Sequence, residues 1–391
     1  MNLLAALGVQ LVLVHGARPQ IEAKLNEARH AGRVHKGVRV TDGFALAAAK
    51  EASGRLRVEI EALLSMGLPN SPMAGADIRV ASGNFITAKP LGVLDGVDYM
   101  HTGEVRKVHA AAIGKRLADN ELVLLSPLGY SPTGEVFNVT LEDVAASAAI
   151  ALRAEKLIFM MDTPGVAGRR GELLRELTVK QAKARIARGT QAESDVRFYL
   201  PWAVRACEEG VKRAHLISGH IDDALLLELF THKGVGTLIT PDPIQTLRPA
   251  RVDDIGGILQ LIEPLEAEGT LVKRNRSLLE SEVNRFVVIE HDGIVIACAA
   301  LYPFPEERVG ELAGLAVRPD FRNQGAGERL LKEIEVRARR MKLKRLFVLT
   351  TRAEHWFVER GFTETDIEAL PAPKRALYNL QRRSVVLVKR I

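Results

Sequence analysis

The hydrophobic pattern of the first 240 residues alternates short apolar runs, rich in β-branched residues, with longer stretches of helical period. Such alternation is typical of a mainly parallel sheet that is covered by helices. We expect strands at residues 11–14, 77–80, 122–126, 156–162 and 214–217.

A helix is expected to begin after Thr140, in the segment VTLEDVAASAAIALRAE. The hydroxyl of Thr140 and the carboxylate of Asp143 are placed to satisfy the first free backbone amides of that helix. The apolar run LIFMMD follows directly and predicts the next strand.

A domain boundary is expected where Pro241, Asp242 and Pro243 interrupt the pattern, because two prolines within three residues continue neither a helix nor a central strand. The resulting domains are 1–242 and 243–391. Beyond the boundary, FVVIEHDGIVIACAAL predicts two antiparallel strands joined by a tight turn at Asp292 and Gly293. The expected fold class is therefore α/β, with a mainly parallel first domain and a mixed α/β second domain.

The segment ELAGLAVRPDFRNQGAGERLLKEIEVRARR predicts a strand, a glycine-rich turn and a helix. Glycine at positions 325 and 327 lets backbone amides approach a ligand. The free amides and positive dipole end of such a helix suit a pyrophosphate, and Arg322 adds a guanidinium that binds phosphate with two hydrogen bonds. The apolar positions of the helix are Leu330, Leu331, Ile334, Ala338 and Met341.

Composition narrows the class of protein. The chain is 47% hydrophobic and 26% charged, which is typical of a globular protein. Its net charge of +6 is modest, and no basic block interleaved with aromatic residues indicates nucleic-acid binding. No run approaches the roughly 20 apolar residues of a membrane span, and no secretory signal begins the chain, so we expect a cytoplasmic protein.

Cys207 and Cys298 lack metal-ligand neighbours, so we expect two buried thiols and no metal site.

The order of the parts in the second half, with RLFVLTT and HWFVERGF after the glycine-rich turn, resembles the GNAT acetyltransferase superfamily over residues 247–391. The resemblance implies acetyl-CoA as co-substrate. It places a bulged strand before the turn, whose backbone pairs with pantetheine and faces the thioester carbonyl. The implied acetyl-CoA-binding residues are Leu315, Ala316, Val317, Arg322, Gln324, Gly325, Ala326 and Gly327.

Acyl transfer from a thioester to an amine needs a neutral amine, a stabilised oxyanion and a proton for the departing thiolate. Glu311, at the head of the strand that points to the thioester, is the candidate to take the ammonium proton, directly or through a water. Two residues are candidates to protonate the thiolate. Thr350 could relay a proton from water, and the phenol of Tyr378 lies closer in pKa to a thiol. The sequence does not choose between them.

An acidic acceptor calls for fixed cations beside the amine site. Residues 369–391 carry six lysines and arginines and no acidic residue. The candidate acceptor-binding residues are Lys273, Arg274, Lys374 and Arg383. A basic pocket disfavours a protein lysine as acceptor, because like charges repel.

The first domain resembles the amino-acid kinase family, acetylglutamate kinase especially, in VLVHGARPQI, HKGVRVTD, SGNFI, FNVTLEDVA and AEKLIFMMDTPGV. Kinase activity is not expected, because Ala17 and Arg18 replace two family glycines and FYLPWAVRAC lacks the family's Gly-Gly-Met and lysine. The family strand with its phosphate-binding lysine would precede Met1. We therefore expect either an N-terminally incomplete sequence or a family member with a reduced domain.

An acetylglutamate-kinase-like domain followed by a GNAT domain is similar to the architecture of the bacterial N-acetylglutamate synthase family. This resemblance implies L-glutamate as acceptor, the first step of arginine biosynthesis, and a homo-oligomer. The segment HLISGHIDDALLLELFTHKGVGT resembles the family's arginine-effector site, and the implied contacts are His215, Glu228, Gly234 and Gly236. The family's N-terminal helix, which lies beside the effector and joins subunits into a hexamer, would also precede Met1. Arginine inhibition and hexamer formation are therefore open.

Two alternatives to this function stay open. One is an arginine-sensing regulatory protein with weak or no catalysis, which the intact RNQGAG turn disfavours. The other is a GNAT enzyme that acetylates a different small acidic amine, such as aspartate. Only the acceptor pocket distinguishes these amines.

Overall fold

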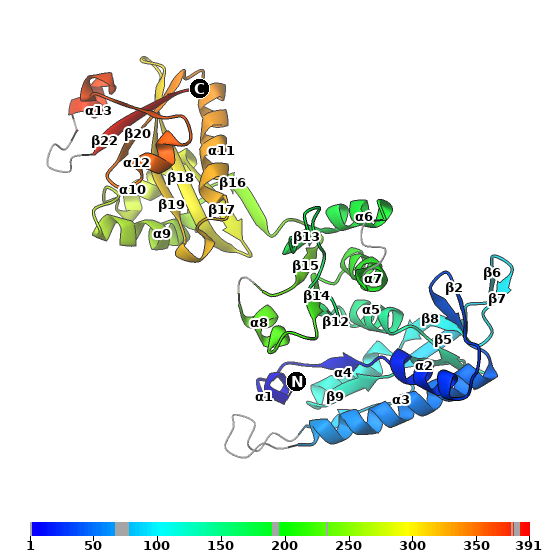
Figure 1. Ribbon diagram of the computed structural model, residues 1–391. Coiled ribbons are helices and arrows are strands. Elements are labelled where there is room, and N and C mark those ends of the chain that lie inside the picture. The colour runs from blue at the N-terminus through cyan, green and yellow to red at the C-terminus, as the bar shows by residue number, and fades with distance from the viewer. Residues whose placement is uncertain (1, 67–77, 190–194, 232–233, 377, 379–383) are drawn as a thin grey trace. The chain divides into compact units, whose positions relative to one another are not determined.

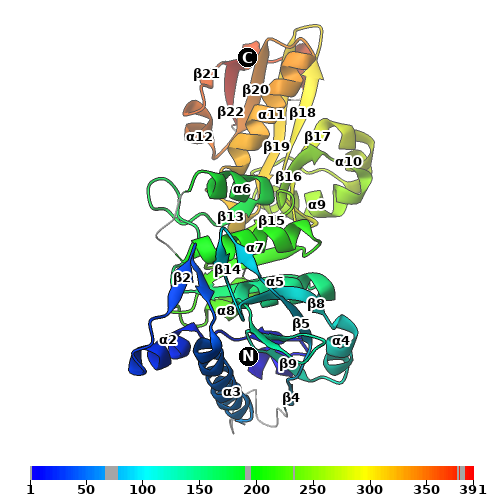
Figure 2. The same cartoon turned by 90° about the vertical axis from the view of Figure 1, so that its right-hand side faces the viewer.

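The computed structural model describes residues 2–66, 78–189, 195–231, 234–376, 378 and 384–391. The chain divides into two compact units, Met1–Asp242 and Pro243–Ile391, each with its own sheets (Figures 1 and 2). Pro241 and Pro243 flank this division. Neither proline has a backbone N–H to donate, which is consistent with the end of one sheet before the next begins.

The described helices of the first unit are α1 (Asn2–Ala6), α2 (Arg18–Glu27), α3 (Gly43–Leu64), α4 (Ala110–Ala118), α5 (Leu141–Leu152), α6 (Val179–Ala187), α7 (Val196–Glu208) and α8 (Ala224–Phe230). Its strands are β1 (Val12–Val14), β2 (Arg33–His35), β3 (Val38–Val40), β4 (Val80–Ala81), β5 (Ile86–Pro90), β6 (Val93–Leu94), β7 (Val97–Asp98), β8 (Gly103–Val108), β9 (Leu122–Leu125), β10 (Leu128–Tyr130), β11 (Val136–Asn138), β12 (Lys156–Met161), β13 (Glu176–Thr178), β14 (Arg213–Ser218) and β15 (Thr237–Thr240).

The strands of the first unit form three larger sheets and two small hairpins. Strands β1, β9 and β4 are parallel in the order β1-β9-β4. The sheet β12-β14-β15-β13 and the sheet β11-β10-β5-β8 each mix parallel and antiparallel pairs. The strand expected at residues 77–80 is shorter than predicted, because β4 begins only at Val80. Asp77 lies outside the described residues.

Helix α5 is buried on two faces. Ala145, Ala146 and Ala149 pack into the core beside β12 and β14, whereas Val144 and Ala148 pack into the core beside β5 and β9. The small alanine side chains let both cores approach the helix closely. An alanine-rich helix between two sheets therefore explains the apolar run that follows Thr140.

The start of α5 corrects one sequence expectation. Thr140 does cap the helix, because its hydroxyl oxygen accepts a hydrogen bond from the amide of Asp143 at 3.3 Å. We expected the carboxylate of Asp143 to cap the helix as well, but it does not. It accepts instead from the Val105 amide at 2.8 Å and from the Ser147 hydroxyl at 2.9 Å, because it faces β8. Burial raises the pKa of this carboxyl.

The described helices of the second unit are η1 (Val252–Asp254), α9 (Ile255–Ala267), α10 (Arg276–Glu282), η2 (Val283–Arg285), η3 (Pro319–Phe321), α11 (Ala326–Arg340), α12 (Glu354–Val358), η4 (Ile367–Ala369) and α13 (Ala372–Ala376). Its strands are β16 (Gln245–Pro249), β17 (Phe286–His291), β18 (Ile294–Phe304), β19 (Val309–Val317), β20 (Arg345–Thr350), β21 (Thr363–Thr365) and β22 (Val385–Arg390).

These strands form one seven-stranded sheet in the order β16-β17-β18-β19-β20-β22-β21. Only the β19–β20 pair is parallel. The predicted hairpin between β17 and β18 is confirmed, and both of its turn residues, Asp292 and Gly293, have positive φ, of 53° and 79°. This mixed sheet agrees with the fold class expected from the sequence.

Helix α11 covers one face of this sheet, against β17, β18 and β19 (Figure 2). Leu330, Leu331, Ile334 and Ala338 are buried there, as the helical spacing predicted. Met341 is not part of this face. It follows the last residue of the helix and is 55% exposed, because α11 ends at Arg340.

Both cysteines are buried, as expected. Burial raises the pKa of Cys207 to about 11 and that of Cys298 to about 12. Both side chains are therefore neutral thiols near neutral pH. Cys298 lies on β18, and its thiol is 3.4 Å from the carbonyl oxygen of Gly314 on β19.

Candidate active site

Strands β19 and β20 pair along only part of their length. The pairs run from Val309 opposite Arg345 to Glu311 opposite Phe347. Beyond Glu311, β19 continues beside β18 and β20 continues beside β22. Among the described strands, none pairs with the backbone groups of β19 that face β20 beyond this point, and an extended ligand can bind to them.

A bulge lies in β19 where the two strands have separated. The β18–β19 register shifts between Cys298 and Ala300, and Gly314 adopts a left-handed φ of 60°. A bulge increases local twist and turns the strand. The expected acetyl-CoA-binding residues Leu315, Ala316 and Val317 follow directly after it on β19.

The turn after β19 leads into α11 through Gly325, the residue before the helix. Gly325 has a φ of 82° and, as a glycine, provides no side-chain cap for the first amides of the helix. These amides and the helix dipole suit an anion. Two further expected residues lie beside them: Gln324 donates to the carbonyl of Asp320 at 3.0 Å, and Arg322 is exposed with its Nε 3.5 Å from the carbonyl of Val317.

The remaining expected residues of the turn, Ala326 and Gly327, form the first turn of α11. Ala326 is buried in the core. A Cβ atom added at Gly327 would lie 3.2 Å from Cζ2 of Trp356. Glycine therefore lets the helix start pack closely against this indole, which holds the anion-binding amides in place.

Glu311 is 7% exposed and lies at the point where β19 and β20 separate. Its Oε1 is 2.9 Å from Nζ of Lys374, which lies on α13. Two residues that the sequence placed in different roles, a base and an acceptor-binding cation, are thus in direct contact. On β18, Tyr302 is the register partner of Glu311, so their side chains lie on the same face of the sheet.

The other expected acceptor-binding residues differ in setting. Arg274 is half-buried, and its Nη1 donates to the carbonyl of Val272 at 3.2 Å. Lys273 is exposed. Arg383 lies outside the described residues.

The two candidate acids are held differently. The hydroxyl oxygen of Thr350 accepts hydrogen bonds from the amides of Ala353 at 2.9 Å and Arg352 at 3.4 Å, in the turn that leads into α12. Tyr378 donates its hydroxyl proton to the carbonyl oxygen of Ser384 at 2.6 Å. The hydroxyl proton of Thr350 is therefore available to another acceptor, whereas the hydroxyl proton of Tyr378 is already donated to Ser384.

In the first unit, the four expected effector residues lie together. The Nδ1 of His215 is 2.7 Å from Oε1 of Glu228, and both side chains are buried. Oε2 of Glu228 accepts from the amides of Val235 at 2.7 Å and Gly236 at 3.0 Å. Burial raises the pKa of Glu228, but the hydrogen bonds of His215 and of these amides together hold it below its ordinary value.

Close steric contacts explain why residues 234 and 236 are glycines. A Cβ atom at Gly234, which has a φ of 54°, would lie 2.5 Å from Oε2 of Glu228. At Gly236, it would overlap the carbonyl oxygen of Leu216. Glycine at 234 therefore leaves room for Glu228, and glycine at 236 allows the close approach to the backbone of β14.

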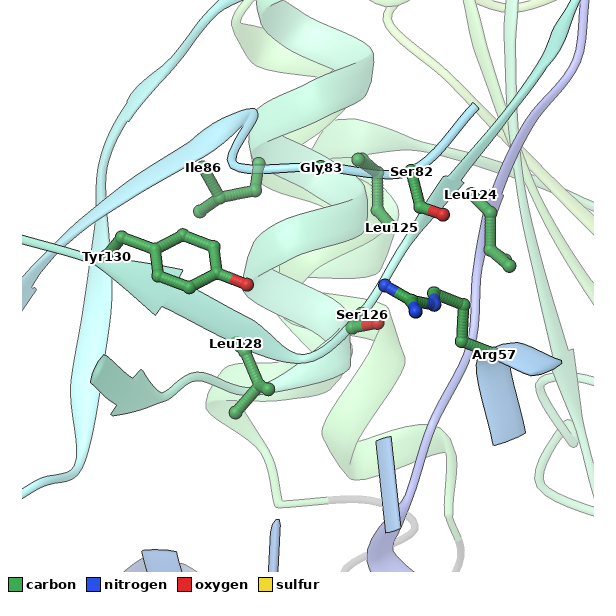
Figure 3. A pocket seen from close by; sticks show the side chains of 9 residues that line it. All are labelled: Arg57, Ser82, Gly83, Ile86, Leu124, Leu125, Ser126, Leu128 and Tyr130. Carbon is green, nitrogen blue, oxygen red and sulfur yellow. The ribbon is translucent and has the colours of Figure 1, made fainter. Parts of the chain in front are cut away.

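A cavity of about 50 Å³ lies in the first unit at the carboxyl ends of β4 and β9 (Figure 3). It is lined by Arg57, Ser82, Gly83, Ile86, Leu124, Leu125, Ser126, Leu128 and Tyr130. Pockets for drug-sized ligands occupy roughly 300–1,000 Å³, so this cavity is too small for a nucleotide.

Arg18 stands where the kinases that this domain resembles have glycine, and its guanidinium contacts side chains of the same unit. Its Nη2 is 4.0 Å from Oε1 of Glu142. Its guanidinium lies over the ring of Phe198, 5.0 Å from the ring centroid. A large side chain therefore occupies the position where those kinases have glycine.

Two kinds of feature are not found in the part of the chain that the structure describes. No group of three or more His, Cys, Asp or Glu side chains there could hold a metal ion. No described helix is both long enough and apolar enough to cross a membrane.

Tyr302 is a residue of this site that the sequence reasoning missed. A signal existed, because Tyr302 and Glu311 are equally far from the Glu306–Glu307 turn, which predicts that they face one another across a hairpin. The ion pair of Lys374 with Glu311 had no such signal. It depends on how α13 lies over the sheet.

Comparison with known proteins gives two family matches. Residues 1–218 match the amino acid kinase family, and residues 258–362 match the acetyltransferase (GNAT) family. The chain is 54% identical over 389 residues to an amino-acid acetyltransferase of Ralstonia nicotianae, which covers 100% of this chain and 86% of that protein. It is 52% identical over 388 residues to that of Azotobacter vinelandii, with 99% and 89% covered.

Solved structures agree with these matches. An N-acetylglutamate synthase from Neisseria gonorrhoeae, in complex with coenzyme A and L-arginine, has a TM-score of 0.86 and 37% identity. The same protein in complex with coenzyme A and N-acetyl-glutamate has a TM-score of 0.60 and 38% identity. Both comparisons cover 100% of this chain and 89% of the solved one.

Proposed function

The chain belongs to the amino-acid acetyltransferase family, in which an amino-acid-kinase-family domain precedes a GNAT domain, and we propose that it transfers acetyl from acetyl-CoA to the α-amine of L-glutamate. The observation that carries this proposal is the contact of Glu311 with Lys374 at the point where β19 and β20 diverge. A base and a cation for an acidic acceptor meet there. The similar synthase solved with coenzyme A and N-acetyl-glutamate supports the choice of acceptor.

The proposed reaction is a single direct attack. Glu311 takes a proton from the glutamate ammonium, directly or through a water, and the neutral nitrogen attacks the thioester carbon. The backbone amides of β19 after the bulge that point away from β18, at Leu315 and Val317, are proposed to stabilise the oxyanion, whereas the amide of Ala316 faces Cys298 on β18. As the C–S bond breaks, the nitrogen passes its second proton to water, and the products are N-acetylglutamate and CoA, formed without a metal or a covalent enzyme intermediate.

The departing thiolate needs a proton, and Thr350 is the better of the two candidates to deliver it. Its oxygen already accepts two amide hydrogen bonds, so its own proton points elsewhere and a water can replace it. Tyr378 would have to break its bond with the carbonyl of Ser384 first. We therefore propose Thr350 as a relay and Tyr378 as a structural residue.

The acetyl-CoA and acceptor sites follow from the same elements. We propose that the free amides at Gly325, Ala326 and Gly327 hold the pyrophosphate, with Arg322 beside them. Because Gln324 bonds within the turn, its side chain supports the turn's shape. Lys374 and Arg274 are proposed to bind the two carboxylates of glutamate, and Arg383 and Lys273 stay candidates from the sequence.

The first domain is proposed to regulate and not to phosphorylate. The cluster of His215, Glu228, Gly234 and Gly236 supports an L-arginine site, because the buried carboxylate of Glu228 suits a guanidinium. Allosteric regulation, a homo-oligomeric state and a cytoplasmic location are further parts of this proposal, which rest on the family resemblance. L-Arginine binding, measured by titration calorimetry against L-lysine as control, tests the effector site. Equal or no binding of the two amino acids would contradict it.

The proposal is tested by identifying the product. Purified protein with acetyl-CoA is incubated with ¹⁵N-labelled L-glutamate, L-aspartate or no acceptor, and acetylated amino acid is measured by mass spectrometry. Labelled N-acetylglutamate in large excess over N-acetylaspartate is expected. Preferential acetylation of aspartate would favour the other acidic amine, and absence of any acetylated amino acid would favour a purely regulatory protein.

A further inference from the structure

The indole of Trp356 lies against the start of α11, beside the amides proposed to hold the pyrophosphate. Its atoms Cζ2, Cη2 and Cε2 would lie 3.2, 3.8 and 3.9 Å from a Cβ atom added at Gly327. These three atoms form one edge of the indole, and Nε1 is bonded to Cε2. The N–H group therefore lies at one end of the edge that faces the first turn of α11.

The indole N–H of Trp356 is available to a ligand. An indole nitrogen can donate a hydrogen bond but cannot accept one. Among the described residues, Nε1 of Trp356 donates to no acceptor, and it is not one of the enclosed side-chain nitrogens, although the ring is half-buried. A donor that is open to solvent beside free helix amides can bind the same anion as those amides.

Arg360 holds the indole by two contacts. Its guanidinium lies over the Trp356 ring, 4.1 Å from the ring centroid, and its Nη1 donates to the Trp356 carbonyl oxygen at 2.9 Å. Tryptophan is the best aromatic partner of a cation, and residues four apart along a helix lie on the same side. The stacked guanidinium therefore limits the rotation of the indole, and it adds a positive charge that favours an anion nearby.

The helix that carries the indole and the turn before α11 rest on one core. The rings of Trp356 and Phe357 meet edge to face, with centroids 4.9 Å apart and an interplanar angle of 89°. Phe357 is buried and packs on Phe362, at a centroid distance of 5.3 Å. Phe321, in the turn that follows β19, belongs to the same core. Packing of both segments on this core fixes the indole relative to the start of α11.

We propose that the indole N–H of Trp356 donates a hydrogen bond to a pyrophosphate oxygen of acetyl-CoA, and that Arg360 is a positioning residue that orients the indole for this bond. This inference rests on the proposed acetyl-CoA site at the start of α11, and it does not depend on which amine is the acceptor. Trp356 contacts the co-substrate far from the thioester. It therefore contributes to acetyl-CoA binding and not to the chemical step.

Binding of CoA to the full chain, measured by titration calorimetry, tests the hydrogen bond. Trp356→Phe keeps an aromatic ring but removes the N–H, and we expect CoA to bind about tenfold more weakly, since one hydrogen bond to a charged group is lost. Trp202→Phe is the matched control, because Trp202 also lies under an arginine, Arg205, at 5.3 Å, but in the first unit. The control should bind CoA as wild type does. Unchanged CoA affinity in Trp356→Phe would overturn the inference.

Dephospho-CoA shows which phosphate accepts the hydrogen bond. This ligand lacks the 3′-phosphate of CoA but retains the pyrophosphate. The loss of affinity caused by Trp356→Phe should be the same for CoA and for dephospho-CoA. A loss that is seen with CoA alone would assign the bond to the 3′-phosphate and overturn the inference.

An isosteric replacement separates the hydrogen bond from the packing of the ring. Benzothienylalanine in place of Trp356 carries sulfur where the indole has its N–H, and it keeps the bicyclic shape that contacts Gly327. It should weaken CoA binding as much as Trp356→Phe does. Wild-type affinity in this variant would show that only packing matters, and the proposed bond would be rejected.

Arg360→Lys tests the positioning role, because lysine keeps the positive charge but not the planar stacking group. We expect CoA to bind several-fold more weakly. In a Trp356→Phe background, the same substitution should have little further effect, since the N–H that Arg360 orients is gone. Full additivity of the two effects would overturn the positioning role.

Steady-state kinetics provide a second readout. In Trp356→Phe, the KM for acetyl-CoA should rise about tenfold, with kcat and the KM for L-glutamate within about twofold of wild type. A fall in kcat at an unchanged KM for acetyl-CoA would overturn the inference.

These outcomes are distinct from failure of the proposed function. Wild-type protein that binds CoA no better than Trp356→Phe does would reject this inference alone. Wild-type protein that binds no CoA would reject the proposed acetyl-CoA site and this inference with it. If wild-type protein binds CoA but does not acetylate glutamate, the proposed acceptor fails, and the calorimetric comparison still decides the role of Trp356.

Discussion

The ammonium nitrogen of Lys374 lies 2.9 Å from Oε1 of Glu311. A carboxylate that is paired with a lysine is stabilised in its charged form, but it must exchange that lysine for the acceptor ammonium before it takes a proton. A carboxylate on the acceptor can draw Lys374 away. An acidic acceptor would thus release the base that activates it.

Replacement of Lys374 by glutamine should weaken the preference for an acidic acceptor. The ratio of kcat/KM for L-glutamate to that for L-glutamine is expected to fall about tenfold, because the cation that pairs with the acceptor carboxylate is lost. Steady-state kinetics with both acceptors measure the ratio. Lys332→Gln, at an exposed lysine of α11 that pairs with Glu328, is the control. An unchanged ratio in Lys374→Gln would remove Lys374 from the acceptor site.

Replacement of Gly325 by alanine should weaken acetyl-CoA binding. A non-glycine residue at a φ of 82° costs about 1 kcal/mol, and relief of this strain would turn the first amides of α11 away from the pyrophosphate. The KM for acetyl-CoA is expected to rise several-fold, with the KM for glutamate unchanged. Gly325→Asn should be affected less, since asparagine tolerates a left-handed backbone. Equal effects on both substrates would point to general unfolding instead.

The two candidate acids are separated by matched substitutions. Thr350→Val keeps the shape but removes the hydroxyl, and it should lower kcat about 100-fold if Thr350 relays the proton. The lost hydrogen bonds with the amides of Arg352 and Ala353 add about 1 kcal/mol of destabilisation, which a thermal melt measures separately. Thr350→Ser should retain most of the activity. Tyr378→Phe is expected to stay within about twofold of wild type, and a larger loss there than in Thr350→Val would reverse the assignment.

The buried carboxylate of Glu228 should make the first unit sensitive to acid. Its pKa is lowered in the folded protein, so its contribution to stability is complete above the ordinary value of 4.5 and is lost as the pH falls through the folded value. Glu228→Gln is expected to lower the free energy of unfolding by about 1–3 kcal/mol at pH 7. This difference from wild type should shrink below about pH 4.

Trp202 provides a way to measure this in the first unit alone. In a Trp356→Phe background, Trp202 is the single tryptophan, so its fluorescence during urea unfolding reports on α7. Glu209→Gln, which removes an exposed carboxylate paired with Arg205, is the control and should change little. A Glu228→Gln effect that stays the same from pH 7 down to about pH 3 would contradict the assigned charge.

Local signals made part of this architecture predictable. Asp292 and Gly293 predict a two-residue turn because both tolerate a positive φ, and the hairpin forms there. Thr140 predicts a helix start because its hydroxyl reaches an amide three residues later, and α5 begins there. In each case the cause lies within a few residues of the effect.

Long-range contacts determine the structural features that the sequence did not predict. Asp143 looked like a second cap for α5, but β8 supplies an amide at Val105 that its carboxylate accepts. Met341 fits the helical spacing of α11, yet the helix ends one residue before it. The hydrogen bond of Tyr302 with Glu282 depends on the approach of α10 to β18, which no local pattern encodes.

The central claim is that Glu311 activates a glutamate amine for attack on acetyl-CoA. The most direct measurement is release of the CoA thiol from acetyl-CoA by wild type and Glu311→Gln, with L-glutamate, with L-aspartate and without acceptor. Glu307→Gln, at an exposed carboxylate in the β18–β19 connection, is the control. Loss of the general base should lower kcat with glutamate at least about 100-fold, while the KM for acetyl-CoA stays unchanged. Glutamate-dependent release that persists in Glu311→Gln at the wild-type rate would contradict the account.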